Sequence, residues 1–222
     1  MSTHPEKALE SLAEKLSEYR GLDLSERHIF LLWIITQGMN ILGAERPILV
    51  GGGAVEFYTG VRFSTGDLDL VVSHPGECEQ VLSALEFLKA RDSKYYVSRA
   101  LGALVDIHGA KLGRSEKTVE VVYRKVPLLV VCPEDCVAER LAAFRKHGSS
   151  LDLLNAFFVA HHNHERLNAE HLHERIGAMV VWEQFRLIQS VSRNLVLHHT
   201  GVDEAAGELI QFMKKGVHTC AF

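Results

Sequence analysis

The segment from Ile48 to Val72 constrains the fold of this chain more tightly than any other. It reads ILVGGGAVEFYTGVRFSTGDLDLVV. Residues 47–50 predict a short buried strand, and residues 67–72 alternate between acidic and apolar side chains, which predicts a second strand. Glycines break the chain before a helix that we expect to begin at Ala54 and to end at Gly60. This order favours a mixed α/β arrangement, because a strand, a glycine break, a helix and a second strand follow one another closely.

The flanking sequence extends this arrangement on both sides. Helices are expected over residues 9–19, 25–42 and 75–91, and three further strands over residues 101–108, 118–123 and 127–131. From Pro133 onward the pattern is helical, with expected helices over residues 133–147, 151–164, 169–197 and 202–215. We therefore predict an α/β (α+β) fold, with a mixed-sheet core and two leading helices over residues 1–132 and a helical region over residues 133–222.

Composition excludes several classes of protein. The chain has 222 residues, of which 47% are hydrophobic, and its 24 Lys and Arg against 28 Asp and Glu give a formal net charge of −4. This is the composition of an ordinary folded protein, and it excludes wholesale disorder, a collagen-like chain and a small disulfide scaffold. The acidic balance also argues against a protein that coats nucleic acid by bulk charge, although it leaves a local basic groove open.

No targeting or membrane signal stands out. Residues 1–10 are polar, and polar side chains interrupt the most apolar run, residues 29–42. Four cysteines are scattered along the chain, and the spacing of Cys132 and Cys136 matches neither a redox motif nor a paired zinc knuckle. We therefore expect reduced thiols, a cytoplasmic location and no membrane partner.

Two features of the central segment point to phosphate chemistry. Asp67 and Asp69 are two residues apart on a predicted strand, so both carboxylates project from the same face. Such a pair repels itself unless a cation lies between, and Mg²⁺ favours one or two carboxylates together with substrate phosphates. Gly51 and Gly52 lie between a strand and a helix, where missing Cβ atoms and a helix N-terminus favour an approaching phosphate.

The order of these features resembles the signature of the nucleotidyltransferase superfamily, the proteins with a DNA polymerase β-like fold. In that family Gly-Gly-x-Ala follows a strand, and Thr-x-Asp-x-Asp follows the next helix; the matching residues here are 51–54 and 65–69. The resemblance covers residues 48–160. It implies transfer of a nucleoside monophosphate from a triphosphate, such as ATP, to a hydroxyl group. It also implies Mg²⁺ or Mn²⁺ held by three carboxylates, two of them Asp67 and Asp69.

The resemblance places the third carboxylate on a later strand of the same sheet. Asp106, within Ala-Leu-Val-Asp-Ile-His, is the best match, because its shorter side chain suits a tight metal site. Glu120, within Val-Glu-Val, is the alternative. In the implied mechanism Asp67 and Asp69 orient the triphosphate through the metal, and Asp106 helps to deprotonate the acceptor hydroxyl. The residues expected to bind the nucleotide are Gly51, Gly52, Arg62, Thr65, Lys111 and Arg140.

Residues 130–144 resemble a segment of the AbiEii-like abortive-infection toxins, in which a strand leads into Pro-Glu-Asp and a helix. This chain has Arg140 where a lysine is usual, and Asn155 where a second aspartate follows in a later helix. The resemblance implies a toxin–antitoxin system with a protein partner. The two departures leave open an alternative, a catalytically degenerate module that only binds.

Two weaker patterns lie in the helical region. Histidines crowd into residues 161–173, where His161 and Glu165 have a spacing seen in zinc sites, but a solvated helix end explains them better. Arg193 and His198 fit the Arg-x4-His motif of the HEPN ribonucleases, which a chain rich in histidine also produces by chance. The sequence does not name the acceptor: RNA, a protein hydroxyl and a small molecule such as an aminoglycoside all stay open.

Overall fold

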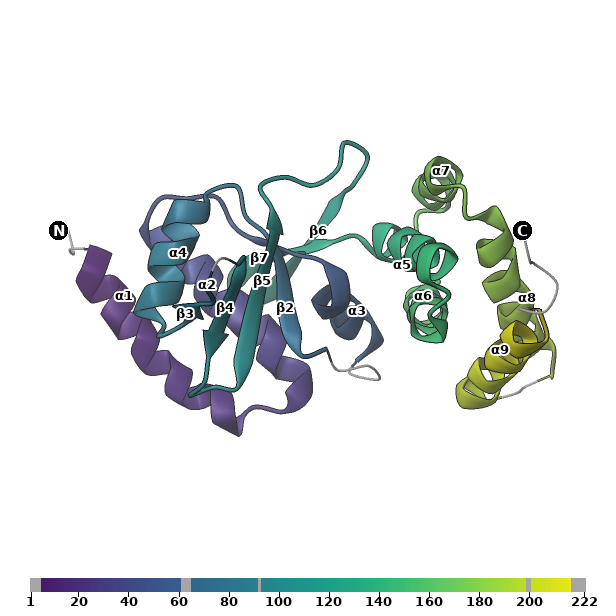
Figure 1. The fold of residues 1–222 in the computed structure, drawn as a ribbon, viewed down its shortest axis with the longest axis horizontal. Coiled ribbons are helices and arrows are strands. Elements are labelled where there is room, and N and C mark those ends of the chain that lie inside the picture. Colours follow the sequence, from purple (N-terminus) through teal and green to yellow (C-terminus); the bar gives the residue numbers. More distant parts are fainter. Residues whose placement is uncertain (1–4, 61–64, 92, 199–200, 217–222) are drawn as a thin grey trace. The chain divides into compact units, whose positions relative to one another are not determined.

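The computed structural model describes residues 5–60, 65–91, 93–198 and 201–216, drawn in Figure 1. The chain divides into two compact units, Met1–Cys132 and Pro133–Phe222. The first unit holds the sheet and the second is helical. Each is described in turn.

A seven-stranded mixed sheet forms the centre of the first unit. Its strands lie in the order β3-β4-β5-β2-β1-β7-β6. β2 runs parallel to β5 and β1 runs parallel to β7, whereas the other neighbouring pairs are antiparallel. The predicted mixed α/β class is confirmed. The strands are β1 Ile48–Leu49, β2 Asp67–Val71, β3 Leu88–Lys89, β4 Tyr95–Ser98, β5 Ala103–Gly109, β6 Thr118–Tyr123 and β7 Val126–Val131.

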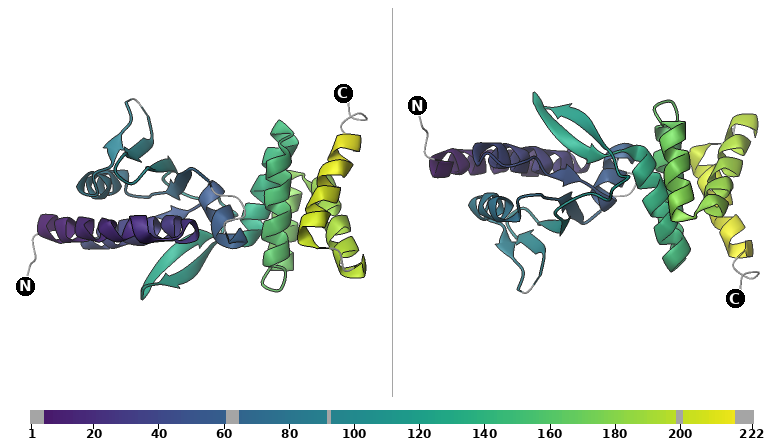
Figure 2. Two further views of the ribbon diagram at one scale, coloured as in Figure 1. Left: turned by 90° about the horizontal axis from the view of Figure 1, so that it is seen from below. Right: turned by 90° about the horizontal axis from the view of Figure 1, so that it is seen from above.

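Helix α2 forms much of the core of this unit. Residues 29–35 along it are all buried, so the helix is apolar around its whole circumference rather than along one stripe. It packs against β2 and β7, while α1 and α4 pack against it (Figure 2). The helical elements of the unit are α1 Pro5–Glu14, the 3-10 helix η1 Lys15–Gly21, α2 Leu24–Ile41, α3 Gly51–Thr59 and α4 Pro75–Ala84.

The glycines after β1 belong to a helix and do not form a separate break. α3 begins at Gly51 rather than at the predicted Ala54. Gly51 has a φ of +56°, a left-handed conformation that turns the chain directly from β1 into the helix. A Cβ atom on Gly53 would come within 2.8 Å of the Leu49 side chain, so the helix can pack this closely only because the glycine lacks one.

The predicted helix over residues 75–91 is too long. α4 ends at Ala84, and Glu86 takes a left-handed conformation, with a φ of 60°. Leu88, which continues the apolar spacing of the helix, lies in β3 with 71% of its surface exposed. β3 pairs with β4, a strand that the sequence pattern did not predict.

The second unit consists of packed helices in the residues that the structure describes. α5 contacts α6 and α7, and α6 contacts α8 and α9. The single helix predicted over residues 169–197 is two helices, because Val180 adopts a left-handed conformation with a φ of 55° between them. None of the described helices combines the length and the apolar character that a membrane crossing needs. The helices are α5 Pro133–His147, α6 Ser150–His162, α7 Ala169–Met179, α8 Trp182–His198 and α9 Val202–Gly216.

The described cysteines are buried and reduced. Cys78, Cys132 and Cys136 form no disulfide, and Cys220 lies outside the described residues. Burial raises the pKa of the Cys78 thiol to about 12 and holds that of Cys136 well above its usual value. Both thiols therefore stay protonated near neutral pH and are poor nucleophiles and metal ligands.

Candidate functional site

Two neighbouring strands bring two carboxylates and an imidazole together. β2 and β5 are parallel, and their register places Asp69 directly beside Asp106. His108 lies two residues after Asp106, so its side chain leaves the same face of the sheet. The His108 Nε2 atom lies 2.8 Å from Asp69 Oδ1 and 3.2 Å from Asp106 Oδ2. One ligand atom from each of the three residues lies within 4.8 Å of the others, which is a spacing that could hold a metal ion.

The backbone at the start of α3 fixes the carboxylate of Asp69. The Gly52 amide donates a hydrogen bond of 2.7 Å to Asp69 Oδ2. A Cβ atom on Gly51 would lie only 2.2 Å from this oxygen, and one on Gly52 would lie 2.4 Å from the Thr65 side chain. The two glycines were expected to cradle a phosphate. In the structure, their missing Cβ atoms allow Asp69 and Thr65 to approach the N-terminus of α3. The negative charge of Asp69 also suits that end of the helix.

Asp106 carries an oxygen with unused hydrogen-bonding capacity. Its side chain is buried, and Lys94 Nζ lies 3.2 Å from Oδ1. The contact with Lys94 does not form a hydrogen bond, and Oδ1 accepts none from the described residues. A buried carboxylate oxygen without a hydrogen-bond donor is costly unless a cation compensates it. The Lys94 ammonium, 3.2 Å away, supplies this compensation in the structure, and a bound metal would share the oxygen with it or displace it.

Asp67 lies on the same face of β2 as Asp69, but it is not part of the cluster of Asp69, Asp106 and His108. Its pKa is raised above the usual value, chiefly because burial disfavours the charged carboxylate, and further because Asp69 and Asp106 are negative. A cation bound between these carboxylates would remove that repulsion. The raised pKa of Asp67 therefore indicates that positively charged groups of the protein do not fully neutralise the carboxylates at this site.

Neutralising Asp67 should stabilise the metal-free protein. A carboxyl group with a raised pKa lowers stability at any pH above that pKa, where it is ionised beside like charges. In excess EDTA at pH 7, we expect Asp67→Asn to melt roughly 1–2 °C above the wild type in calorimetry. The rise is small because Asp67 is only partly buried and solvent screens its neighbours. The difference should shrink as the pH falls toward about 3.9, the unfolded-state value, and a variant that melts lower than the wild type at pH 7 would contradict this account.

Thr65 joins the segment before β2 to α3. Its backbone amide donates a 3.0 Å hydrogen bond to Glu56 Oε2, and its hydroxyl donates one of 3.1 Å to the Asp67 carbonyl oxygen. Glu56 is buried and lies 3.3 Å from His28 Nδ1 of α2. The structure thus gives Thr65 a positioning contact at the start of β2, beside the residues expected to bind metal.

Glu120, the alternative third carboxylate, lies far from the cluster within the sheet. It is on β6, an edge strand that three other strands separate from β5. Its side chain is 54% exposed, and its carboxylate forms a 2.9 Å ion pair with Arg46. The structure thus brings Asp106, and not Glu120, beside Asp69.

Lys111, one of the cations expected to bind the nucleotide, does not lie at this cluster. Lys111 follows β5 and lines a hollow with Ile48 and Val71, at the opposite end of β2 from Asp67. Arg140 lies in the second unit, where it forms a 3.2 Å ion pair with Asp152. Arg62 lies outside the described residues.

The Pro-Glu-Asp segment makes contacts within the second unit. Asp135 is fully buried in α5 and pairs with Arg175 and His171 of α7. Glu134 accepts a hydrogen bond from the Asn168 amide at the start of α7. These acidic side chains tie α5 to α7, because buried carboxylates must be paired.

The histidines between residues 161 and 164 make helix-end contacts. His162 Nδ1 lies 2.8 Å from the Phe158 carbonyl oxygen, and His164 Nδ1 lies 2.9 Å from that of His161. His161, His162 and His164 belong to no potential ligand group in the described part of the chain and lie at a polar helix end, as the sequence pattern favoured. The prediction of solvated histidines is wrong for His171 of the same run, which is buried and pairs with Asp135.

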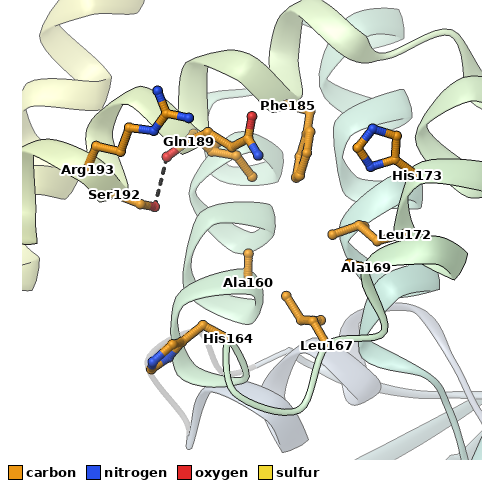
Figure 3. Close-up of a pocket in the computed structure, with 11 residues that line it drawn as sticks. Ala160, His164, Leu167, Ala169, Leu172, His173, Phe185, Gln189, Ser192 and Arg193 are labelled. Carbon is orange, nitrogen blue, oxygen red and sulfur yellow. Dashed lines mark hydrogen bonds between the residues drawn. The ribbon is translucent and has the colours of Figure 1, made fainter.

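Arg193, the first residue of the Arg-x4-His pattern, lines a pocket of about 440 Å³ in the second unit (Figure 3). Leu172 and Phe185 give the pocket much of its apolar wall, and the pocket lies among α6, α7 and α8. The side chain of His198 lies outside the described residues. The ribonuclease pattern therefore stays a sequence prediction.

Comparison with protein-family models, with curated proteins and with solved structures finds no match to this chain. The relation to the nucleotidyltransferase superfamily therefore stays a prediction, carried by residues 51–54 and 65–69 and by the geometry around them.

Sequence reasoning had not included His108 in the site. Its signal is the two-residue spacing from Asp106, which puts both side chains on one face of a strand.

Proposed function

We propose that this protein is a Mg²⁺- or Mn²⁺-dependent nucleotidyltransferase that moves a nucleoside monophosphate from a triphosphate to a hydroxyl acceptor. One observation carries the proposal. Asp69 and Asp106 lie side by side on parallel strands, with Asp67 on the same face, directly beside the glycine turn into α3. Carboxylates converging next to a helix N-terminus are suited to a metal–triphosphate complex.

The donor set fits a hard divalent cation. Asp67, Asp69 and Asp106 would hold it through their carboxylate oxygens. When bound, the cation would supply charge neutralisation for the triphosphate and for the pyrophosphate that leaves. The Gly52 amide is already engaged by Asp69, so nucleotide binding in this proposal depends mainly on the metal.

The transfer itself requires one bond to form and one to break. The acceptor hydroxyl oxygen attacks the α-phosphorus, and the bond from that phosphorus to the bridging oxygen of the β-phosphate breaks, so that pyrophosphate leaves. Asp106 is placed to take the hydroxyl proton, because its buried carboxylate has acceptor capacity to spare. His108 and Lys94 border the same carboxylate and limit where the acceptor can enter.

Calorimetric titration of each of the four nucleoside triphosphates, with and without Mg²⁺, tests this function. We expect binding in the micromolar to millimolar range that requires the metal, and at least roughly tenfold weaker binding to Asp67→Asn. Asp23→Asn is the matched control, because the same substitution then falls on an exposed residue next to α2. Transfer of α-labelled nucleotide to RNA, protein and small-molecule acceptors would follow.

Two outcomes would count against the proposal. An Asp67→Ala/Asp69→Ala double variant that still transferred label would show that the carboxylates do not carry the chemistry. Absence of binding for all four triphosphates, with Mg²⁺ or Mn²⁺ present, would remove the nucleotide site.

A second candidate function rests on the ion pairs at the cluster. His108 and Lys94 already lie against the carboxylates of Asp69 and Asp106, so the site balances part of its charge without a metal. This observation favours a catalytically degenerate module that binds a protein partner, such as one half of a toxin–antitoxin pair. Failure to bind both metal and nucleotide would support it over the transferase.

A further inference from the structure

The imidazole of His108 distinguishes this cluster from a site made only of carboxylates. One ring nitrogen faces both Asp69 Oδ1 and Asp106 Oδ2, at 2.8 Å and 3.2 Å. A single nitrogen carries one hydrogen and cannot donate a full hydrogen bond to both oxygens. The ring is therefore placed at the point where the two carboxylates converge.

The two separations from the ring nitrogen are close to those in the first coordination shell of a small divalent cation. In an octahedral site with bonds of about 2.1 Å, neighbouring ligand atoms lie about 3.0 Å apart. The two nitrogen–oxygen separations fall on either side of that value. His108 is 43% exposed on its side chain, so a cation and its water ligands can reach the ring nitrogen from solvent.

We propose that His108 is a metal ligand, and that Asp69, Asp106 and His108 form a site that binds a first-row transition-metal dication such as Mn²⁺ in preference to Mg²⁺. This inference rests on the metal site of the proposed function and names its preferred cation. Mg²⁺ prefers oxygen ligands alone, whereas imidazole raises the affinity for transition metals. The proposed ligand atom of Asp106 is Oδ2, which faces the ring nitrogen, while Oδ1 lies 3.2 Å from the Lys94 ammonium.

Pulsed electron paramagnetic resonance of the protein with Mn²⁺ alone tests the assignment, because a coordinated ring nitrogen modulates the electron spin echo. We expect nitrogen modulation in the wild type and none in His108→Gln. His164→Gln is the control, since His164 is an exposed histidine of the second unit, and it should retain the modulation.

Competition between Mn²⁺ and Mg²⁺ gives a second measurement. We expect the wild type to favour Mn²⁺ by roughly tenfold or more, and the preference to fall several-fold in His108→Gln. Circular dichroism of each variant would confirm that it folds.

The outcomes separate this inference from the function on which it rests. Mn²⁺ binding without nitrogen modulation, or an unchanged Mn²⁺ preference in His108→Gln, would overturn the role of His108 and leave the transferase proposal intact. Mn²⁺ binding with nitrogen modulation but without triphosphate binding would uphold the metal site and remove the transferase. Absence of Mn²⁺ binding would overturn the inference.

Discussion

Replacing Asp106 with Asn is expected to lower the rate of nucleotide transfer by about 10²–10³-fold, in line with the loss of one group that stabilises transition-state charge. The substitution keeps the shape of the side chain but removes its negative charge. It also turns one of the two carboxylate oxygens into an amide group. Because the proposed function uses this charge both to hold the metal and to accept the proton, kcat should fall more than KM rises.

Glu120→Gln is the matched control for this experiment. Glu120 is an acid of the same sheet and was the alternative third carboxylate, but it lies exposed on β6 beside Arg46. We expect transfer by this variant within about twofold of the wild type, since changes at exposed positions rarely matter. Equal losses in the two variants would contradict the assignment of Asp106. A large loss in Glu120→Gln alone would move the third carboxylate to β6.

Gly51→Ala should destabilise the protein by about 2.5–5 kcal/mol and weaken metal binding at the same time. Part of the cost, about 1–2 kcal/mol, comes from a left-handed backbone at a residue with a Cβ atom. The rest arises because that Cβ would lie 2.2 Å from Asp69 Oδ2, so the carboxylate must move. The movement breaks the charged hydrogen bond from the Gly52 amide, worth about 1.5–3 kcal/mol.

Gly60→Ala isolates the contribution of the close contact. Gly60 has a φ of +61°, nearly the same as Gly51, but among the described atoms none lies within 4 Å of a Cβ added there. Urea unfolding of both variants should show about 1–2 kcal/mol lost in Gly60→Ala, the backbone cost alone. Mn²⁺ binding should weaken only in Gly51→Ala. If the two variants lose the same stability, the approach of Asp69 to α3 has no energetic importance.

The strands that hold the site were predictable because their signals are local. Alternation over residues 67–72 and the apolar run around Asp106 mark β2 and β5, and the two-residue spacing fixes which acids share a face. Local signals do not predict that Asp69 and Asp106 are neighbours, because this follows from the pairing of two strands that are distant in sequence. The family resemblance, and not periodicity, suggested Asp106.

The missed features share a physical cause. Glu86 and Val180 take left-handed conformations that usually belong to glycine or asparagine, so the sequence carries no stop signal where α4 and α7 end. His108 looks like the last residue of a strand, and its closeness to Asp69 exists only once β2 and β5 have paired. The contacts of Asp69 with Gly52, and of Arg140 with Asp152, likewise arise from tertiary packing.

The seating of Asp69 against Gly51 and Gly52 has an evolutionary consequence. A Cβ atom at position 51 would lie 2.2 Å from Asp69 Oδ2, so any residue other than glycine there forces the aspartate at position 69 to move. Drift at either position is therefore constrained by the other, and the glycine persists for as long as the aspartate is selected. If the aspartate at position 69 were lost, position 51 could accept any small side chain that tolerates the left-handed turn. The residues at positions 51 and 69 of any homologous chain would then indicate whether that chain retains the site.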